Sequence, residues 1–190
     1  MDASAFKLGE QFSVVQLQAL EHTTIKKPTR IAFHFALDNS ASMGSNTNLA
    51  LKAFSPLVDM ATDPCSLTVF DSSAVTLSAS LWTAQQMCAC SLPRQGQTNI
   101  SEGVERALDV VLDREAMEPS CTHHVLILLS DGGHNSGRSP ETAVPCLRAT
   151  LKSRAPDARL SGAVLRLDHA TSGLAPRRIP AWYRNLVSIS

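Results

Sequence analysis

The fold is decided by a stretch that begins apolar and ends in oxygen-bearing side chains: Ile31-Ala32-Phe33-His34-Phe35-Ala36-Leu37-Asp38-Asn39-Ser40-Ala41-Ser42. Its first seven residues are mostly apolar and contain no Gly or Pro, which is typical of a strand buried on both faces. Asp38 and the alternating hydroxyls of Ser40 and Ser42 follow at once. Open α/β sheets bind ligands at the carboxyl ends of their strands, because the connecting loops separate there. The stretch therefore predicts an oxygen-rich site at one edge of a sheet.

Two interpretations of these side chains are open from this segment alone. Carboxylate and hydroxyl oxygens with no thiol or imidazole nearby favour Mg²⁺, Mn²⁺ or Ca²⁺ over zinc. Alternatively, Ser40 and Ser42 only cap the following helix, because a hydroxyl can also accept a hydrogen bond from a helix N-terminal amide.

A second segment places a further hydroxyl at a helix start. Gly96-Gln97-Thr98-Asn99-Ile100 precedes a helical pattern that we expect over 99–114. Asn99 is followed three residues later by Glu102, which predicts a capping pair and leaves Thr98 just outside the helix.

A third segment supplies another carboxylate. The apolar run Val125-Leu126-Ile127-Leu128-Leu129-Ser130 predicts a second buried strand, and it ends in Asp131-Gly132-Gly133. If the three segments meet at one sheet edge, their oxygen atoms can converge on one cation.

In this order and spacing, the three segments resemble the metal-ion-dependent adhesion site of the von Willebrand factor A-type domain. The resemblance covers roughly residues 30–167 and weakens beyond Asp168. It implies a doubly wound α/β fold with a mostly parallel central sheet, one antiparallel edge strand and helices on both faces. The residues that match the metal-site pattern are Asp38, Ser40, Ser42, Thr98 and Asp131.

The resemblance also implies a role for each of these residues. The two serines would bind the metal directly, Thr98 directly or through water, and Asp38 and Asp131 largely through bound water and charge. A cation held mostly by neutral hydroxyls stays electrophilic, so an Asp or Glu carboxylate from a partner protein can take its open position. We therefore expect a metal-dependent protein-interaction module that uses Mg²⁺, or Mn²⁺ or Ca²⁺. The alternative is a scaffold or assembly subunit that uses the same fold without metal.

We do not expect an enzyme. A metal-dependent hydrolase is a less favoured interpretation of the site than a binding module. Metal-assisted hydrolysis needs a general base beside the metal-bound water. His134 is the only obvious candidate, and it lies in a Gly- and Ser-rich loop. A phosphatase of the Asp-x-Asp type would need a carboxylate where Ser40 stands. The sequence contains no Walker loop, nucleophile elbow or dinucleotide fingerprint.

The remaining pattern predicts the other elements of the sheet and its helices. A precursor strand within 11–21 should lie at an edge of the sheet, in an extension of residues 1–29 that precedes a domain of residues 30–190. The short spacing between 65–70 and 75–77 predicts an antiparallel hairpin. Pro56 should bend or split the first helix, and Pro145 should confine a later helix mainly to 146–154. A turn at 171–173 and a last strand at 186–189 complete the expectation.

Composition narrows the classes of partner. Lys plus Arg and Asp plus Glu each number 17, so no overall charge would attract nucleic acid or acidic lipid. No apolar run approaches the ~18 residues needed to span a bilayer. The five cysteines are an odd number, and the first residues lack the pattern of a secretory signal, so we expect reduced thiols and a cytoplasmic protein. A metal site of Cys88, Cys90, His123 and His124 is conceivable but disfavoured, because a Cys-x-Cys pair is a poor zinc knuckle.

Overall fold

The computed structural model describes residues 13–16, 30–93, 96–118, 122–131, 133–166 and 182. Its strands are β1 (Ser13–Gln16), β2 (Arg30–Asp38), β3 (Cys65–Phe70), β4 (Ala74–Leu81), β5 (Thr122–Ser130) and β6 (Arg159–Arg166). Its helices are α1 (Asn46–Met60), α2 (Ala84–Cys88), α3 (Ile100–Met117) and α4 (Pro140–Arg154). The predicted turn at 171–173 and strand at 186–189 lie outside the described residues.

The strands form one six-stranded sheet in the order β1-β6-β5-β2-β3-β4. The four inner strands run parallel, and β2 lies at the centre between β5 and β3. β4 pairs antiparallel with β3, which confirms the predicted hairpin, and it continues to Leu81. β1 pairs antiparallel with β6, so the predicted precursor strand does lie at an edge, and both edges are antiparallel. The domain boundary between residues 29 and 30 stays a prediction.

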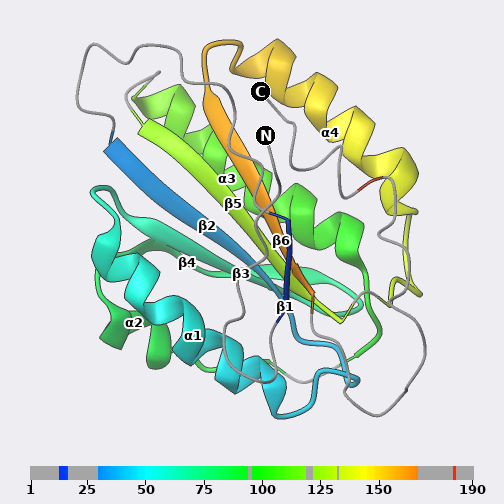
Figure 1. Ribbon diagram of the computed structural model, residues 1–190. Coiled ribbons are helices and arrows are strands. Elements are labelled where there is room, and N and C mark those ends of the chain that lie inside the picture. The colour runs from blue at the N-terminus through cyan, green and yellow to red at the C-terminus, as the bar shows by residue number, and fades with distance from the viewer. Residues whose placement is uncertain are drawn as a thin grey trace.

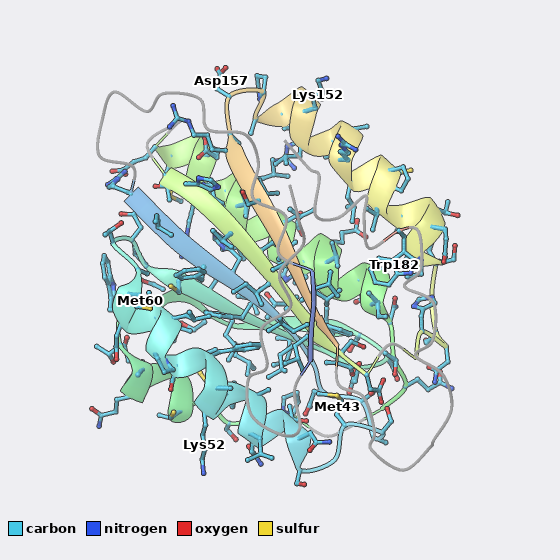
Figure 2. All side chains as sticks on the ribbon, in the orientation of Figure 1. Met43, Lys52, Met60, Lys152, Asp157 and Trp182 are labelled. Atoms are coloured by element: carbon cyan, nitrogen blue, oxygen red, sulfur yellow. The ribbon has the colours of Figure 1, made fainter. Side chains whose placement is uncertain are left out.

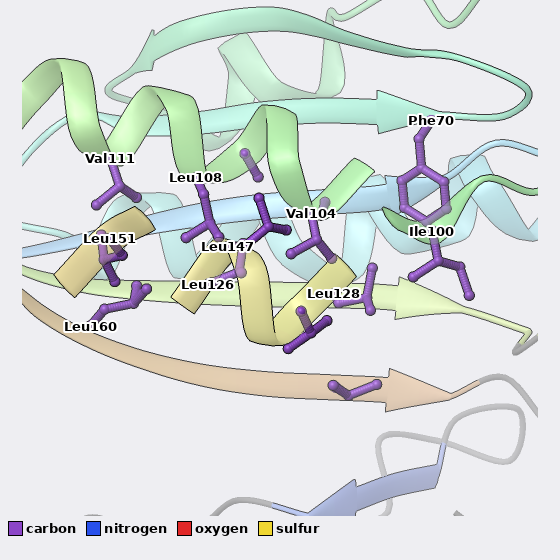
Figure 3. Packing of buried hydrophobic residues seen from close by; sticks show 14 of the residues in the cluster. Phe70, Ile100, Val104, Leu108, Val111, Leu126, Leu128, Leu147, Leu151 and Leu160 are labelled. Atoms are coloured by element: carbon purple, nitrogen blue, oxygen red, sulfur yellow. The ribbon is translucent and has the colours of Figure 1, made fainter. Parts of the chain in front are cut away.

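Helices cover both faces of the sheet, with α1 and α2 on one face and α3 and α4 on the other (Figure 1). Strand alternation divides the core accordingly, because successive side chains point to opposite faces. In β2, Phe35 and Leu37 pack on the α1 face, whereas Ala36 belongs to the α3 and α4 face. Figure 3 shows this second cluster, in which α3 and α4 pack leucine and valine side chains onto β5 and β6.

The two internal prolines do not interrupt their helices, so the predicted split at Pro56 and the predicted helix start near Cys146 are wrong. α1 runs unbroken through Pro56, and the Ser55 hydroxyl donates to the Lys52 carbonyl over 3.0 Å. That carbonyl is the one that the missing Pro56 amide would have bonded. α4 begins at Pro140 and not near Cys146, and Pro145 lies exposed on its surface.

α3 lies so close to the sheet that a side chain at one of its glycine positions would have to displace a neighbour. A Cβ added at Gly103 would lie 2.3 Å from Cδ1 of Phe70, whose side chain is buried at the end of β3. Asn99 caps α3 as predicted, since its side-chain oxygen accepts from the Glu102 amide over 3.3 Å. Among the described helices, none is both long enough and apolar enough to cross a membrane.

Candidate metal centre

Asp38 is a fully buried carboxylate at the carboxyl end of β2. Its Oδ1 accepts the Ser40 amide over 2.9 Å, and its Oδ2 accepts the Ser130 hydroxyl over 2.6 Å. Both oxygens are therefore held in a defined orientation by the loop and by the neighbouring strand. We did not identify Ser130 from the sequence. Asp38 and Ser130 come directly after the paired residues Leu37 and Leu129, but that register is known only from the folded sheet.

The electrostatic setting of Asp38 favours a nearby cation. Burial raises the pKa of the Asp38 carboxyl above its usual value, and the hydrogen bonds from Ser130 and Ser40 only partly oppose that rise. The charge of Asp131 raises the same pKa further, so the two carboxylates lie close enough to repel each other. A bound divalent cation would remove that repulsion.

The loop after Asp38 presents two hydroxyls side by side. The Oγ atoms of Ser40 and Ser42 lie 3.1 Å apart; Ser40 is buried and Ser42 is exposed. The loop turns through a bond from the Met43 amide to the Ser40 carbonyl at 3.0 Å. The Met43 side chain is buried in the α1-face core, and Figure 2 shows Met43 and Met60 near opposite ends of α1.

The helix-capping interpretation of these serines is wrong. Ser45 occupies the N-cap position of α1, and its side chain makes no capping hydrogen bond. Within the described part of the chain, neither the Ser40 nor the Ser42 hydroxyl bonds an amide of α1. Their lone pairs are thus available to a ligand outside the helix.

The spacing of the two hydroxyls fits an octahedral cation. Mg²⁺ binds oxygen at about 2.0–2.1 Å in near-ideal octahedral geometry, which puts neighbouring ligands about 3 Å apart. The 3.1 Å between the Ser40 and Ser42 oxygens matches that separation. The donor set of carboxylates and hydroxyls, without thiol or imidazole, suits the same class of hard cation.

Thr98 reaches this edge on a loop that is tied to both neighbouring loops. The Ala41 amide donates to the Gly96 carbonyl over 3.1 Å, which joins the serine loop to the segment before α3. On the other side, the Thr98 amide donates to Oδ1 of Asn135 over 2.8 Å, and the Asn135 amide donates to the Thr98 carbonyl over 3.1 Å. The Thr98 hydroxyl takes part in none of these bonds. Asn135 is a second positioning residue that we did not identify from the sequence, since nothing local pairs it with Thr98.

The β3–β4 turn also holds the Thr98 loop in place through hydrogen bonds. The Gln97 amide donates to the Ser72 hydroxyl over 2.9 Å, and the Asn99 amide to the Asp71 carbonyl over 2.7 Å. A Cβ added at Gly96 would lie 2.6 Å from the Ser72 hydroxyl oxygen, so a side chain there would have to displace the hydroxyl that accepts from the Gln97 amide.

All five predicted residues thus lie at the carboxyl ends of the parallel strands. Asp38 is the last residue of β2, and the other four lie on adjoining loops. Contacts or charge link Asp38 with Ser40, Ser40 with Ser42, and Asp38 with Asp131, whereas Thr98 is placed by its backbone. Within the described residues, no group of three or more His, Cys, Asp or Glu side chains is arranged so that it could hold a metal ion. The candidate centre has two carboxylates, and its other oxygen atoms belong to hydroxyls.

His134 is poorly placed as a general base. Among the described residues, its buried Nδ1 has no hydrogen-bond partner, so no acceptor orients the imidazole through that nitrogen. A catalytic histidine needs such an orienting partner to present its other nitrogen to a reacting group.

The disfavoured cysteine and histidine site is not formed. Both ring nitrogens of His124 are within hydrogen-bond distance of other buried groups, namely His34 and Glu115. Nε2 of His123 lies 2.7 Å from the Ser161 hydroxyl instead. The described cysteines, Cys65, Cys88, Cys90 and Cys146, are free thiols.

Comparison with known proteins places the fold. No family model and no curated protein matches the sequence. The crystal structure of the conserved hypothetical protein BatB from Bacteroides thetaiotaomicron aligns with a TM-score of 0.51 at 14% identity, over 85% of this chain and 86% of that one. The vWF domain of the pili tip protein Mfa5 from Porphyromonas gingivalis aligns at 0.41 and 16% identity, over 78% and 56%.

Proximal thread matrix protein 1 from the mussel byssus, with a zinc-occupied MIDAS motif, aligns at 0.49 and 20% identity. That match covers 70% of this chain but only 35% of the mussel protein. The likeness to BatB spans most of both chains. This chain therefore has the fold of the von Willebrand factor A-type domain.

Proposed function

We propose that this chain is a protein-interaction module that captures an acidic side chain of a partner protein through a divalent cation. The cation would be held by Asp38, Ser40, Ser42, Thr98 and Asp131, with Mg²⁺ or Mn²⁺ as the expected ions. The observation that carries this proposal is the pair of Ser40 and Ser42 hydroxyls, 3.1 Å apart, beside a buried carboxylate. Neither hydroxyl is used to cap α1, so no structural role in the helix explains them.

The arrangement supports binding better than catalysis. Asp38 is held by Ser130 and by the Ser40 amide, so it supplies charge and orientation and is not free to take a proton from substrate. The cation would supply a positive charge at the exposed end of the loops, where Ser42 faces solvent. A carboxylate oxygen from outside is the natural hard ligand for that position.

Thermal unfolding with and without metal tests the proposal. At ~100 times its dissociation constant, a cation that binds only the folded state adds about 2.7 kcal/mol of stability. For a domain of this size, that corresponds to a rise of about 5–10 °C in Tm. We expect this rise with millimolar Mg²⁺ or Mn²⁺ and its reversal by EDTA.

Two serines in the same loop provide the variant and its control. Ser42→Ala removes a proposed ligand and should abolish the metal-induced rise in Tm. Ser45→Ala removes an exposed hydroxyl that makes no capping bond, and it should leave the rise unchanged. Capture of wild-type protein on an immobilised acidic peptide should require Mg²⁺. Equal capture in Mg²⁺ and in EDTA would instead support the metal-independent scaffold.

A further inference from the structure

Beneath α3, four buried polar side chains form a continuous chain that the proposed binding site does not use. We call Ser66, His34, His124 and Glu115 the histidine relay. The Ser66 hydroxyl lies 2.8 Å from Nδ1 of His34, and Nε2 of His34 lies 2.8 Å from Nδ1 of His124. Nε2 of His124 lies 2.8 Å from Oε1 of Glu115. The relay thus connects β3, β2 and β5 to α3, and each of its side chains is at least nine-tenths buried.

Counting protons assigns the direction of every bond. Glu115 as a carboxylate can only accept, so Nε2 of His124 carries a proton and its Nδ1 does not. Nε2 of His34 must then donate to His124, and Nδ1 of His34 must accept from the Ser66 hydroxyl. With both imidazoles neutral, each of the three contacts contains one proton, and each of these relay nitrogen and oxygen atoms has a hydrogen-bond partner.

An added proton disturbs this arrangement. A proton on Nδ1 of His124 faces the proton on Nε2 of His34, unless His34 and Ser66 both reverse their bonds. A second added proton has no place at all, because two N–H groups would then meet across 2.8 Å. The relay is therefore complete without rearrangement only in its neutral-histidine form, and no rearrangement accommodates protonation of both histidines.

Burial and the charge of Arg114 also disfavour protonation of the two histidines. Burial lowers the pKa of His34 well below its usual value, and the neighbouring charges of His124 and Arg114 lower it further. Burial also lowers the pKa of His124, whereas the hydrogen bond and charge of Glu115 and the charge of Asp63 oppose that effect. Arg114 comes from α3 and Asp63 from the loop before β3. On the same face of β6, the residue paired with His124 is Leu160, which is apolar.

We propose that the histidine relay is an acid-sensitive latch that holds the C-terminal half of α3 on the sheet. Glu115 is the only member of the relay that α3 contributes, so α3 is bound to the other three members through the His124 contact. Next to it, the Arg114 guanidinium donates to carbonyls at Pro64, Cys65 and Ala79, which do not change charge with pH. Protonation of the histidines breaks the relay and loosens this part of α3 first.

The sign of the pH dependence follows from linkage. Both histidines bind a proton less readily in the folded state than in the unfolded chain, where their pKa is near 6.5. Stability is therefore fully present above about pH 6.5 and is lost as the pH falls below it. Each proton that only the opened state binds reduces protection about tenfold per pH unit.

Amide hydrogen exchange at pH 7.5, 6.5 and 5.5, corrected for intrinsic rates, tests the latch. In the wild-type chain, protection in the last ten residues of α3 should fall at least tenfold by pH 5.5, while protection in α1 falls less. The triple variant His34→Leu, His124→Leu and Glu115→Met should lose this difference. His123→Gln is the matched control: it changes the adjacent residue of β5, whose side chain lies on the opposite face, and should retain the acid response.

A milder variant keeps the test decisive if the triple variant does not fold. Glu115→Gln preserves an acceptor for Nε2 of His124 but removes the charge that favours an added proton. The acid loss of protection in α3 should therefore become larger. Equal loss of protection in α1 and α3 of the wild type would overturn the latch. An unchanged or smaller acid response in Glu115→Gln would overturn it as well.

Discussion

β2 and β5 carry polar side chains in two regions. At their carboxyl ends, Asp38 and Ser130 lie next to loops that reach solvent. Nearer their amino ends, His34 and His124 are covered by α3. In the histidine relay, each polar group has a partner within the protein, and none faces outward. At the candidate metal centre, the Ser42 hydroxyl is exposed and two carboxylates repel each other. Buried polar groups that satisfy one another stabilise a fold, and polar groups left partly unsatisfied at an open edge are suited to bind a ligand.

This contrast predicts opposite effects of removing a polar group at the two places. The largest effect should come from His124→Leu, which removes the imidazole that donates to the buried Glu115 carboxylate. A buried polar group that loses its hydrogen bond costs about 1–3 kcal/mol, and more if it is charged. Both the Glu115 carboxylate and the His34 N–H lose their bond to His124, so we expect a loss of about 3–5 kcal/mol at pH 7.5. Chemical denaturation measures it directly.

The neighbouring residue is the control for that loss. His123→Leu removes one contact of a half-buried side chain to Ser161 and should cost no more than about 1.5 kcal/mol. Equal costs for the two variants would show that the relay has no special importance for stability.

A smaller effect on stability is expected from a change at Gly103 in α3, the helix that connects the Thr98 loop to the histidine relay. Gly103→Ala places a methyl group 2.3 Å from Cδ1 of the buried Phe70 ring, so the ring or the helix must shift. Overpacking of this kind costs about 1–3 kcal/mol. Because the same helix carries Glu115 and follows Thr98, the variant should weaken both metal-induced stabilisation and the protection of α3.

Gly133→Ala provides the matched glycine control. Its added Cβ would lie 3.6 Å from Oδ1 of Asp131, an ordinary contact distance, so stability in EDTA should change by less than about 0.5 kcal/mol. If the two alanine variants have the same stability, the close approach of α3 to Phe70 is not a constraint on the fold.

The smallest effect on stability, and the one of opposite sign, is expected at the metal centre. Asp38→Asn or Asp131→Asn removes one of two repelling charges, so the metal-free protein should be as stable as wild type or more stable by up to about 1 kcal/mol. The same changes should abolish stabilisation by metal. Denaturation of both variants in EDTA and in Mg²⁺ provides the comparison.

A loss of stability in EDTA for both Asp variants would contradict the metal-centre reading. In that case, the carboxylates act as acceptors that hold the loops together, and their replacement should cost about 0.5–2 kcal/mol. Ser42→Ala distinguishes the cases further, because it removes a proposed ligand and leaves the charges unchanged.

Much of the fold could be predicted because its signals are local. The apolar runs before Asp38 and Asp131 correspond to β2 and β5, and the capping pair of Asn99 and Glu102 starts α3 one residue later. The two prolines misled the prediction for the opposite reason. Whether Pro56 breaks α1 depends on a substitute donor for the Lys52 carbonyl, and Ser55 supplies it only in the folded helix.

The supporting residues of the candidate centre could not be predicted in the same way. Ser130 meets Asp38 only because β5 and β2 pair in one particular parallel register, and Asn135 meets Thr98 across 37 positions of sequence. No periodicity or motif within either segment determines such a pairing.

The sequence by itself determined the order of strands and helices and the oxygen-bearing residues at the strand ends, since both depend on neighbours along the chain. The tertiary structure alone decided that Ser130 orients Asp38, that Asn135 positions Thr98, and that His34 and His124 meet beneath Glu115. These contacts depend on strand register and on how closely α3 packs. Both are set by the burial of side chains distant in sequence, and no local pattern specifies them.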